Sequence, residues 1–247
     1  MEAENVIQVR ELTKKFGSFT AVNRISFEVK QGEIFGFLGA NGAGKSTAMR
    51  ILCGLMKPTS GEARIGGINV EEKPEIIKKQ IGYMSQKFSL YSYLKVWENL
   101  RLYGGIYGLS NYEIENKTNE LLKKLNFEEQ RNTLVKDLPT GWKQKLAFMA
   151  AIIHTPRIVF LDEPTGGVDP RSRRQFWDLI YDAAGAGITV FVTTHYMDEA
   201  EYCDRVSVMV DGSIEALDTP ARLKEKYNLP TMDAVFTAIA RGAKNNE

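Results

Sequence analysis

The sequence predicts an α/β fold whose core is a mostly parallel sheet, interrupted by a helical insert. The runs 34–38, 158–161 and 188–192 are almost entirely apolar, as expected for central strands that are buried on both faces. Segments with helical spacing follow these runs, which is typical of parallel strands joined by helices. Between about 88 and 153 this alternation stops and helical spacing continues. Together these observations favour an α/β core with an inserted α-helical subdomain.

The expected strands are short apolar runs bounded by Gly or Asp. They cover 25–29, 34–38, 81–84, 158–161, 188–192 and 206–210. The pair Asp211-Gly212 separates the last run from another strand-like run, which predicts a β-hairpin over 206–217. This hairpin would add an antiparallel β part to the parallel sheet.

Helices are expected in the insert and near the C-terminus. Four apolar residues from Ile114 to Leu125 fall on one helix face, and the second of two helices after 220 has an apolar face that includes Val235 and Ile239. His154, at the end of an expected helix, is assigned only a favourable contact with the helix dipole. We therefore expect a single domain over 1–247, divided into a core (5–87 and 154–218), a helical subdomain (88–153) and a C-terminal helical extension (219–247).

The composition excludes several classes of protein. The chain has 247 residues, and its 43% hydrophobic content is that of an ordinary globular protein. With 32 Lys and Arg against 31 Asp and Glu, the net charge of +1 argues against nucleic-acid binding through a general basic field. Cys53 and Cys203 are too few for a disulfide framework. Apolar runs stay well short of the roughly 18 residues that cross a bilayer, and a signal-peptide pattern is missing, so we expect a cytoplasmic protein.

A phosphate-binding loop follows the expected strand 34–38. The segment GANGAGKST fits the pattern G-x-x-x-x-G-K-[ST]. Its glycines let backbone N–H groups point inward around a phosphate, and the following helix adds its positive end. Lys45 would reach the β- and γ-phosphates, and the Ser46 hydroxyl would bind Mg²⁺. The expected nucleotide contacts are Gly39, Asn41, Gly42, Ala43, Gly44, Lys45, Ser46 and Thr47.

Polar residues end two other expected strands at the same edge of the sheet. Asp162 closes the run 158–161 and would join the Mg²⁺ shell, while Glu163 would orient and deprotonate the attacking water. His195 closes the next strand and would donate to a γ-phosphate oxygen. The alternatives are a polar turn before Pro164, and a histidine that caps a helix beginning near Tyr196.

Five motifs in the expected order make the chain resemble the ATP-binding subunit of an ABC transporter. They are GANGAGKST, Gln86 after Tyr83-Met84-Ser85, LPTGWKQKL from Leu138, LDEPTGGVD from Leu161, and His195. The resemblance covers nearly the whole chain and is closest to bacterial export subunits that pair with separately encoded membrane proteins. The stretch THYMDEAEYCDRV from Thr194 reinforces that subgroup. The implied fold is a P-loop NTPase with an ABC-type ATPase core.

The resemblance also implies roles for residues outside the phosphate loop. Phe16 matches the aromatic position that stacks on adenine, where a core aromatic is the alternative, and Val22 would be a second nucleotide contact. Gln86 would contact Mg²⁺ and the attacking water and link the nucleotide state to the membrane partner. Asp169 would cross a dimer interface, and Gly141 would contact the ATP of the opposite subunit.

The block that begins at Leu138 departs from the family pattern L-S-G-G-Q. Pro139 stands where a serine normally contacts the γ-phosphate in the opposite subunit, and proline has no hydrogen-bond donor. Losing one hydrogen bond to a charged group would cost about ten- to a hundredfold in the step that it supports. Two alternatives stay open. Either Thr140 supplies the hydroxyl from the next position, or this block completes a slow site that is paired with a better one.

The function implied by the resemblance is ATP hydrolysis that powers transport, with ATP and Mg²⁺ as cofactors. Two ATPase subunits, identical or different, would enclose two ATP molecules at the inner face of the membrane, beside transmembrane permease subunits and without nucleic acid. The aromatic stretch 88–94, with Tyr91 and Tyr93, would receive a short helix of the permease, unless it only packs the insert against the core. The alternative is a soluble ABC ATPase of translation or DNA maintenance, although such chains usually carry two ATPase domains or long coiled coils. The transported substrate is not encoded in these motifs.

Overall fold

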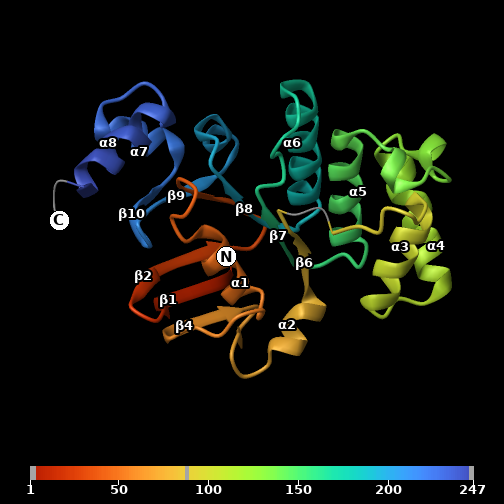
Figure 1. The fold of residues 1–247 in the computed structure, drawn as a ribbon, viewed down its shortest axis with the longest axis horizontal. Helices are drawn as coiled ribbons and strands as arrows, with labels where there is room; N and C mark the ends of the chain where they lie inside the picture. Colours follow the sequence, from red (N-terminus) through yellow and green to blue (C-terminus); the bar gives the residue numbers. More distant parts are fainter. Residues whose placement is uncertain (1–3, 87–88, 245–247) are drawn as a thin grey trace.

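The strands form two sheets of different kinds. The computed structural model describes residues 4–86 and 89–244. An antiparallel sheet has the order β2-β1-β4-β5, and a second, mostly parallel sheet has the order β10-β9-β3-β8-β7-β6 (Figure 1). The strands are β1 (Asn5–Phe16), β2 (Phe19–Lys30), β3 (Ile34–Leu38), β4 (Ser60–Ile65), β5 (Ile68–Asn69), β6 (Ile81–Met84), β7 (Ile158–Asp162), β8 (Thr189–Thr194), β9 (Arg205–Val210) and β10 (Ser213–Asp218).

The centre of the larger sheet confirms the parallel arrangement that its apolar runs predict. Every residue of β3, β7 and β8 is buried. In the register of these strands Leu38 lies opposite Thr194, and Asp162 lies opposite Thr193. The carboxyl ends of β3, β7 and β8 therefore meet at one edge, which is where α/β sheets bind ligands.

The antiparallel sheet packs on the larger sheet through an apolar layer that includes α1 (Lys45–Leu52). A cluster of phenylalanine rings fills this layer, with neighbouring ring centroids 5.3–6.1 Å apart. Such offset and tilted contacts add to the stabilisation from burial of the rings. The rings are Phe27, Phe35, Phe37, Phe160 and Phe191.

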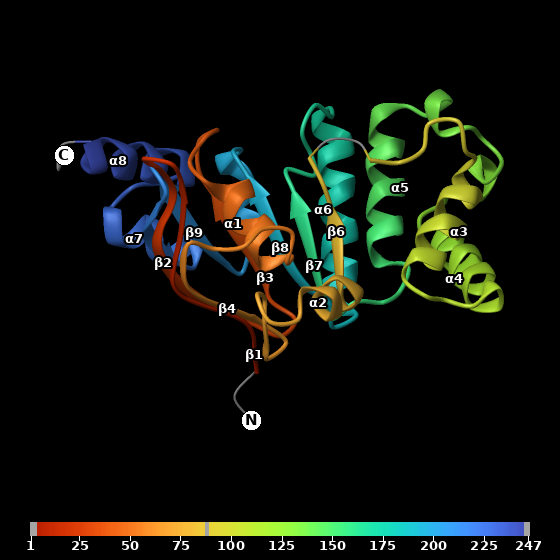
Figure 2. The ribbon, with the colours of Figure 1, turned by 60° about the horizontal axis from the view of Figure 1, so that its bottom comes forward.

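Helices cover the opposite face of the larger sheet and extend away from it. Figures 1 and 2 show α5 standing between α6 and the pair α3 and α4, with α7 and α8 at the other end of the molecule. The α-helices are α2 (Pro74–Gln80), α3 (Val96–Ile106), α4 (Asn111–Lys124), α5 (Thr140–Ile152), α6 (Pro170–Gly185), α7 (Pro220–Tyr227) and α8 (Met232–Lys244). Among the described residues, the 3₁₀ segments η1 (Glu128–Gln130) and η2 (Val135–Asp137) lie between α4 and α5, and η3 (Met197–Tyr202) lies between β8 and β9. Within the described ranges, no helix is long and apolar enough to cross a membrane.

The expected elements are present, with three differences. The run 25–29 is part of the longer strand β2. The strands β1, β4 and β5 were not expected. In β1, shifts in register interrupt the alternation of apolar and polar residues by which a strand is recognised. The expected helix near Tyr196 is the 3₁₀ segment η3. The hairpin over 206–217 is confirmed, since Asp211 and Gly212 both have positive φ, at 43° and 85°, as a tight two-residue turn requires.

The helical insert is built of α3, α4 and α5, and α5 also packs against α6 and β6. The residues of α5 from Leu146 to Ala151 are buried in the same core as the central strands. The expected division into core, helical subdomain and C-terminal extension remains a prediction, and its junction at 87–88 and the tail 245–247 lie outside the described residues.

Candidate active site

The phosphate-binding loop joins the buried strand β3 to α1. Gly44 has φ +101°, and a Cβ atom there would lie 2.2 Å from the carbonyl oxygen of Ala21, so only glycine fits this close approach. The Lys45 side chain is 4% exposed, and its ammonium donates to the carbonyl oxygens of Gly39 at 2.7 Å and Ala40 at 3.1 Å. The loop thus holds a buried cation at its centre.

Two carboxylates lie close to this cation. Nζ of Lys45 is 3.5 Å from Oε1 of Glu163. Burial lowers the pKa of Lys45, while the negative charges of Glu163 and Asp162 oppose part of this shift. Because a buried charge is costly unless it is paired, the two carboxylates stabilise the ammonium of Lys45 at the centre of the loop.

Asp162 lies at the end of β7, with 2% of its surface exposed. Its Oδ1 accepts hydrogen bonds from Ser46 Oγ at 3.0 Å and from Thr193 Oγ1 at 2.7 Å. The carboxylate and the serine hydroxyl therefore present a pair of oxygen donors beside the phosphate loop. The hydroxyl of Thr193, on the neighbouring strand, holds the carboxylate in place.

Glu163 has an unusual backbone for a residue that is not glycine, with φ 49°. Its N–H donates to the hydroxyl of Thr193 at 3.0 Å and to the carbonyl of the same residue at 3.1 Å, which stabilises this strained conformation. Its carboxylate accepts a hydrogen bond from Nε2 of Gln86 at 2.8 Å. Nδ1 of His195 lies 3.0 Å from the same oxygen, but the pair does not have hydrogen-bond alignment.

A cavity of about 430 Å³ opens over the phosphate loop. The exposed rings of Phe16 and Phe19 form one wall, and they lie opposite each other across the β1–β2 turn. Nζ of Lys14 lies 5.2 Å from the centroid of Phe16. The other lining residues are Ala21, Asn41, Gly42, Gly44, Lys45, Ser46, Thr47, Gln86 and Glu163.

The structure brings most of the expected site residues together, but not all. Val22 is fully buried in the core, and its neighbour Ala21 lines the cavity in its place, because alternate residues of a strand face opposite sides. Gly39 and Ala43 are buried in the floor of the loop. Phe19 was missed, although an aromatic residue three positions after Phe16 was a signal that could have indicated it.

The block after Leu138 forms the start of α5 and not a wall of this cavity. Pro139 is the residue that precedes the helix, and Thr140 is exposed in its first turn. A Cβ atom on Gly141 would lie 2.9 Å from Ser172 Oγ, so α5 approaches the start of α6 closely. The Trp142 ring, half-buried, packs on Phe127 with the ring centroids 4.6 Å apart.

Asp169 caps α6. Its carboxylate accepts hydrogen bonds from the N–H groups of Arg171 and Ser172, both at 3.0 Å, and from the Ser172 hydroxyl at 2.6 Å. The hydrogen bonds from Ser172 lower the pKa of Asp169. This exposed residue thus has a structural role within its own chain.

Glu199 is a buried carboxylate that the sequence did not indicate. It is fully buried in η3 and accepts hydrogen bonds from the hydroxyls of Thr165 at 2.5 Å and Thr194 at 2.6 Å. Thr165 follows Glu163 by two residues, and Thr194 directly precedes His195. Glu199 therefore connects the two segments that carry Glu163 and His195.

The fold and this site define a P-loop ATPase of the α/β class, with a buried lysine and two strand-end carboxylates around a phosphate-binding loop. Residues 22–166 match the family model described as ABC transporter, and the chain belongs to this family. The match covers more than half of the chain and includes the phosphate loop, Asp162 and Glu163.

Two curated relatives are named as ATP-binding proteins. The probable multidrug ABC transporter ATP-binding protein YbhF of Escherichia coli (strain K12) is 46% identical over 241 residues, which cover 96% of this chain. The linearmycin resistance ATP-binding protein LnrL of Bacillus subtilis (strain 168) is 35% identical over 88% of this chain and 70% of its own length. The chain spans only 42% of the length of YbhF.

Solved structures of ATP-binding subunits of ABC transporters have the same fold as this chain. A structure described as the ATP-binding subunit of an ABC transporter superposes with a TM-score of 0.85 at 28% identity, covering 95% of this chain and 99% of the other. A dimeric ATP-binding cassette in a post-hydrolysis state, bound to ADP and Pi, superposes with a TM-score of 0.78 at 28% identity, covering 86% and 98%. These likenesses confirm the ABC-type ATPase fold.

Proposed function

We propose that this chain binds and hydrolyses ATP to energise export through a separate transmembrane partner. The observation that carries the proposal is the convergence of Lys45, Gln86 and His195 on the carboxylate of Glu163, at 3.5, 2.8 and 3.0 Å. A carboxylate held at the end of a phosphate loop is suited to orient a water molecule for attack on the γ-phosphate.

In this proposal ATP lies in the cavity over the phosphate loop. The exposed ring of Phe16 stacks on adenine, with Phe19 beside it. The backbone N–H groups from Asn41 to Thr47 surround the phosphates, and Lys45 turns from the carbonyls of its own loop to the β- and γ-phosphates. Its buried charge offsets the charge that develops in the transition state.

Glu163, with the side chains of Gln86 and His195 next to its carboxylate, would carry out the remaining steps of hydrolysis. Glu163 takes the proton of the attacking water, and Gln86 holds the carboxylate and the water in position. The imidazole of His195 donates to the γ-phosphate and thereby responds to its presence. Cleavage removes this contact, which would let the assembly open.

Mg²⁺ fits the oxygen donors at this site. Ser46 Oγ and Asp162 Oδ1 lie 3.0 Å apart, and Gln86 would add a third oxygen. Over the described residues, no group of three or more His, Cys, Asp or Glu is arranged to hold a metal. A Mg²⁺ ion needs only one or two protein ligands when phosphates and water supply the rest. When bound, it would neutralise phosphate charge beside Lys45.

Two subunits would form the complete site. Gly141 lies in the first turn of α5 next to Ser172 and does not line the cavity of its own chain, which supports a contact with the ATP of another subunit. The N-terminus of α5 would direct its positive end at the γ-phosphate. Asp169 would lie at the same interface, and the dimeric cassette with ADP and Pi supports this assembly.

The names of the relatives support export rather than a role in translation or DNA maintenance. YbhF is described as a probable multidrug ABC transporter ATP-binding protein and LnrL as a linearmycin resistance ATP-binding protein. The exposed side chains of Tyr91 and Tyr93, 55% and 81% accessible, would meet a short helix of the permease. Phe88, in the same aromatic stretch, lies outside the described residues. This contact would hold the chain at the cytoplasmic face of the membrane.

The test is Glu163→Gln in the complex purified from the membrane. We expect ATP binding to remain near the wild-type affinity while turnover falls about 10²- to 10⁴-fold, because the amide cannot accept the proton of water. The exposed loop variant Glu71→Gln serves as the matched control and should retain turnover. Near-normal hydrolysis by Glu163→Gln would contradict the assigned base.

A further inference from the structure

Asn99 is a fully buried amide on α3, at a position where this helix faces the core. Val96 and Leu100, on the same side of the helix, are also buried and belong to the larger apolar cluster. A buried amide costs free energy unless its polar atoms have partners, and an apolar side chain would avoid this cost. A buried polar side chain that does have its partners specifies one arrangement of the groups around it.

The partners of Asn99 are backbone groups of the turn 91–95, which leads into α3. Its Oδ1 accepts a hydrogen bond from the N–H of Tyr91 at 2.9 Å, and its Nδ2 donates to the carbonyl of the same residue at 3.1 Å. Nδ2 also donates to the carbonyl of Lys95 at 3.1 Å. One side chain therefore holds both ends of the turn. Asparagine can do this because a carboxamide carries an acceptor and two donors.

The same turn pairs with the segment 131–136, which follows η1. The N–H of Lys136 donates to the carbonyl of Ser92 at 2.9 Å. The N–H of Val135 donates to the carbonyl of Leu94 at 3.0 Å. The turn is therefore fixed by Asn99 on its core side and by backbone pairing along its edge.

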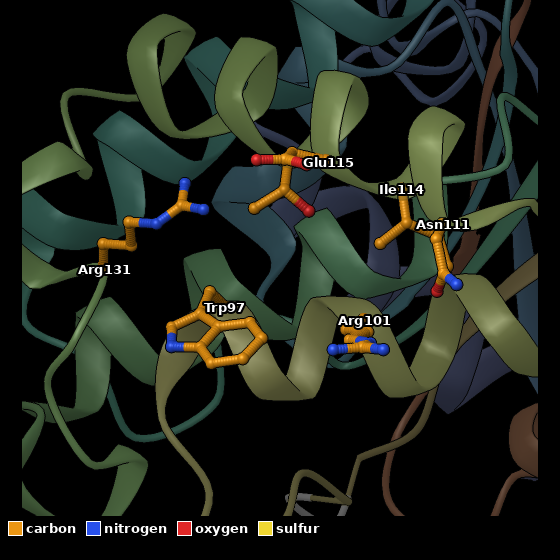
Figure 3. Close-up of a pocket in the computed structure, with 7 residues that line it drawn as sticks. Trp97, Arg101, Asn111, Ile114, Glu115 and Arg131 are labelled. Atoms are coloured by element: carbon orange, nitrogen blue, oxygen red, sulfur yellow. The ribbon is translucent and has the colours of Figure 1, made fainter.

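The start of α3 is joined to this segment as well. The N–H of Trp97 donates to the carbonyl of Arg131 at 3.2 Å. Figure 3 shows the side chains of these two residues on one side of the hollow between α3 and α4, which has a volume of about 380 Å³. The backbone is thus held in place up to the point where the turn enters the helix.

The side chains that this turn presents to solvent are aromatic. Tyr91 and Tyr93 are both exposed, and Nζ of Lys136 lies 5.5 Å from the centroid of the Tyr93 ring. The paired segment therefore places a cation beside one of the rings. A turn whose backbone is fixed from the core presents the two rings in one arrangement, and this lowers the entropy that a binding partner must remove.

We propose that Asn99 is a positioning residue that sets the turn 91–95 for contact with the permease. The inference rests on the proposed function, in which Tyr91 and Tyr93 meet a short helix of the permease. Asn99 is fully buried, so it acts through the backbone of Tyr91 and not by touching the permease. Without its hydrogen bonds the turn would exchange among several conformations. The affinity for the permease would then fall in proportion to the population of the one conformation that matches the helix.

The first measurement is hydrogen exchange of the full chain, followed by mass spectrometry. Asn99→Leu removes the hydrogen bonds and keeps a side chain of similar size at this core position. The amides of 91–95 and of 133–136 should exchange at least tenfold faster than in wild type, because their partners are no longer held in place. The peptide that contains α1 should exchange at the wild-type rate. Unchanged exchange over 91–95 would overturn the proposal.

The second measurement is binding to membrane vesicles of the source cell that have been stripped of peripheral proteins with urea. The wild-type chain should bind these vesicles but not vesicles of the extracted lipid alone. Asn99→Leu should bind about tenfold more weakly, while its ATPase turnover without membranes stays within twofold of wild type. Equal vesicle binding by wild type and Asn99→Leu would refute the role of Asn99 and leave the proposed function intact. If the wild-type chain did not bind, the permease contact would be wrong, and the inference with it.

Two further variants separate positioning from a general loss of stability. Leu122→Ala truncates a buried side chain of α4 and should lower the melting temperature at least as much as Asn99→Leu, yet it should bind the stripped vesicles like wild type. Tyr91→Ser with Tyr93→Ser should weaken binding about tenfold, and adding Asn99→Leu should cause no further loss, because all three changes act on one surface. A hundredfold loss in the triple variant, or a tenfold loss in Leu122→Ala, would contradict the proposal.

Discussion

The side-chain amide of Gln86 donates a hydrogen bond to the carboxylate of Glu163 across 2.8 Å, although the two residues lie 77 positions apart in the sequence. The contact follows from the pairing of β6 and β7, in which Met84 lies opposite Leu161. Gln86 and Glu163 each stand two residues further along their chains, so parallel pairing brings them to the same edge of the sheet.

Removing this amide should slow hydrolysis more than it weakens nucleotide binding. Gln86→Ala leaves Glu163 without the donor that orients it, and we expect kcat to fall about ten- to a hundredfold. The affinity for ATP should change less, because the phosphate loop is untouched. Turnover and equilibrium binding of a fluorescent ATP analogue measure the two effects. Gln130→Ala, on η1, is the control, and equal kinetics in the two variants would exclude an orienting role for Gln86.

Thr140 offers a test of the altered block at the start of α5. Its side chain is exposed in the first helical turn, next to Pro139, so its hydroxyl is free to face another subunit. We expect Thr140→Ala to lower the turnover of the assembled dimer about tenfold, since one hydrogen bond to a charged group is lost. Thr140→Ser keeps the hydroxyl and should keep the rate. Full activity of Thr140→Ala would instead favour a slow site paired with a better one.

Glu199→Gln should reduce both stability and turnover. The carboxylate accepts hydrogen bonds from Thr165 and Thr194, and an amide keeps only one acceptor oxygen for the two hydroxyls. We expect a loss of about 1–3 kcal/mol in the free energy of unfolding, measured with urea, together with a lower kcat. Glu201→Gln alters a partly exposed carboxylate of the same segment, paired with Lys224 at 2.7 Å, and should cost less. Equal losses of unfolding free energy in the two variants would argue against a special role for the hydrogen bonds from Thr165 and Thr194 to Glu199.

His154 should make the stability of the chain depend on acid. Its ring stacks on Tyr107 with centroids 3.5 Å apart, and Nε2 donates to the carbonyl of Ile81 at 3.1 Å. Burial lowers the pKa of His154 from 6.5 to about 4, so the ring is neutral at pH 7 and contributes no charge to the expected contact with the helix dipole. Between these two pKa values the unfolded chain binds more protons than the folded chain.

The free energy of unfolding should therefore be greatest above about pH 6.5 and fall as the pH drops towards about 4. Urea unfolding between pH 7.5 and 5 measures the slope. His154→Phe keeps a ring against Tyr107 but cannot take up a proton, so its stability should depend less on pH. An unchanged slope would mean that another group causes the acid sensitivity.

Most of the residues that the structure brings together at the candidate site could be predicted, because each one is attached to a strong local pattern. Lys45 and Ser46 lie in a contiguous loop motif, and Asp162 ends an apolar run that is long enough to identify a buried strand. The rule that parallel strands present their carboxyl ends at one edge was then sufficient to group Asp162 and His195 with the loop.

Residues whose role depends on side-chain direction could not be assigned in this way. Val22 is the expected nucleotide contact from the sequence, but the side chain of Val22 points into the core from β2, and Ala21 lines the cavity instead. Phe19 joins the cavity only because the β1–β2 turn sets it opposite Phe16. If the strand shifts by one residue, the side chains that faced the cavity face the core instead. A short stretch of sequence does not determine which of the two faces a given side chain takes.

The sequence by itself determined the class of fold, the phosphate-binding loop and the residues at the strand ends, since periodicity and contiguous motifs are local properties of a chain. Only the tertiary structure decided which groups meet across long separations. The burial of Glu199 between Thr165 and Thr194, the stack of Tyr107 on His154, and the pairing of the turn 91–95 with the segment 131–136 all arise where separate elements pack together. Their energies depend on burial and on the distances between partners, which no local pattern encodes.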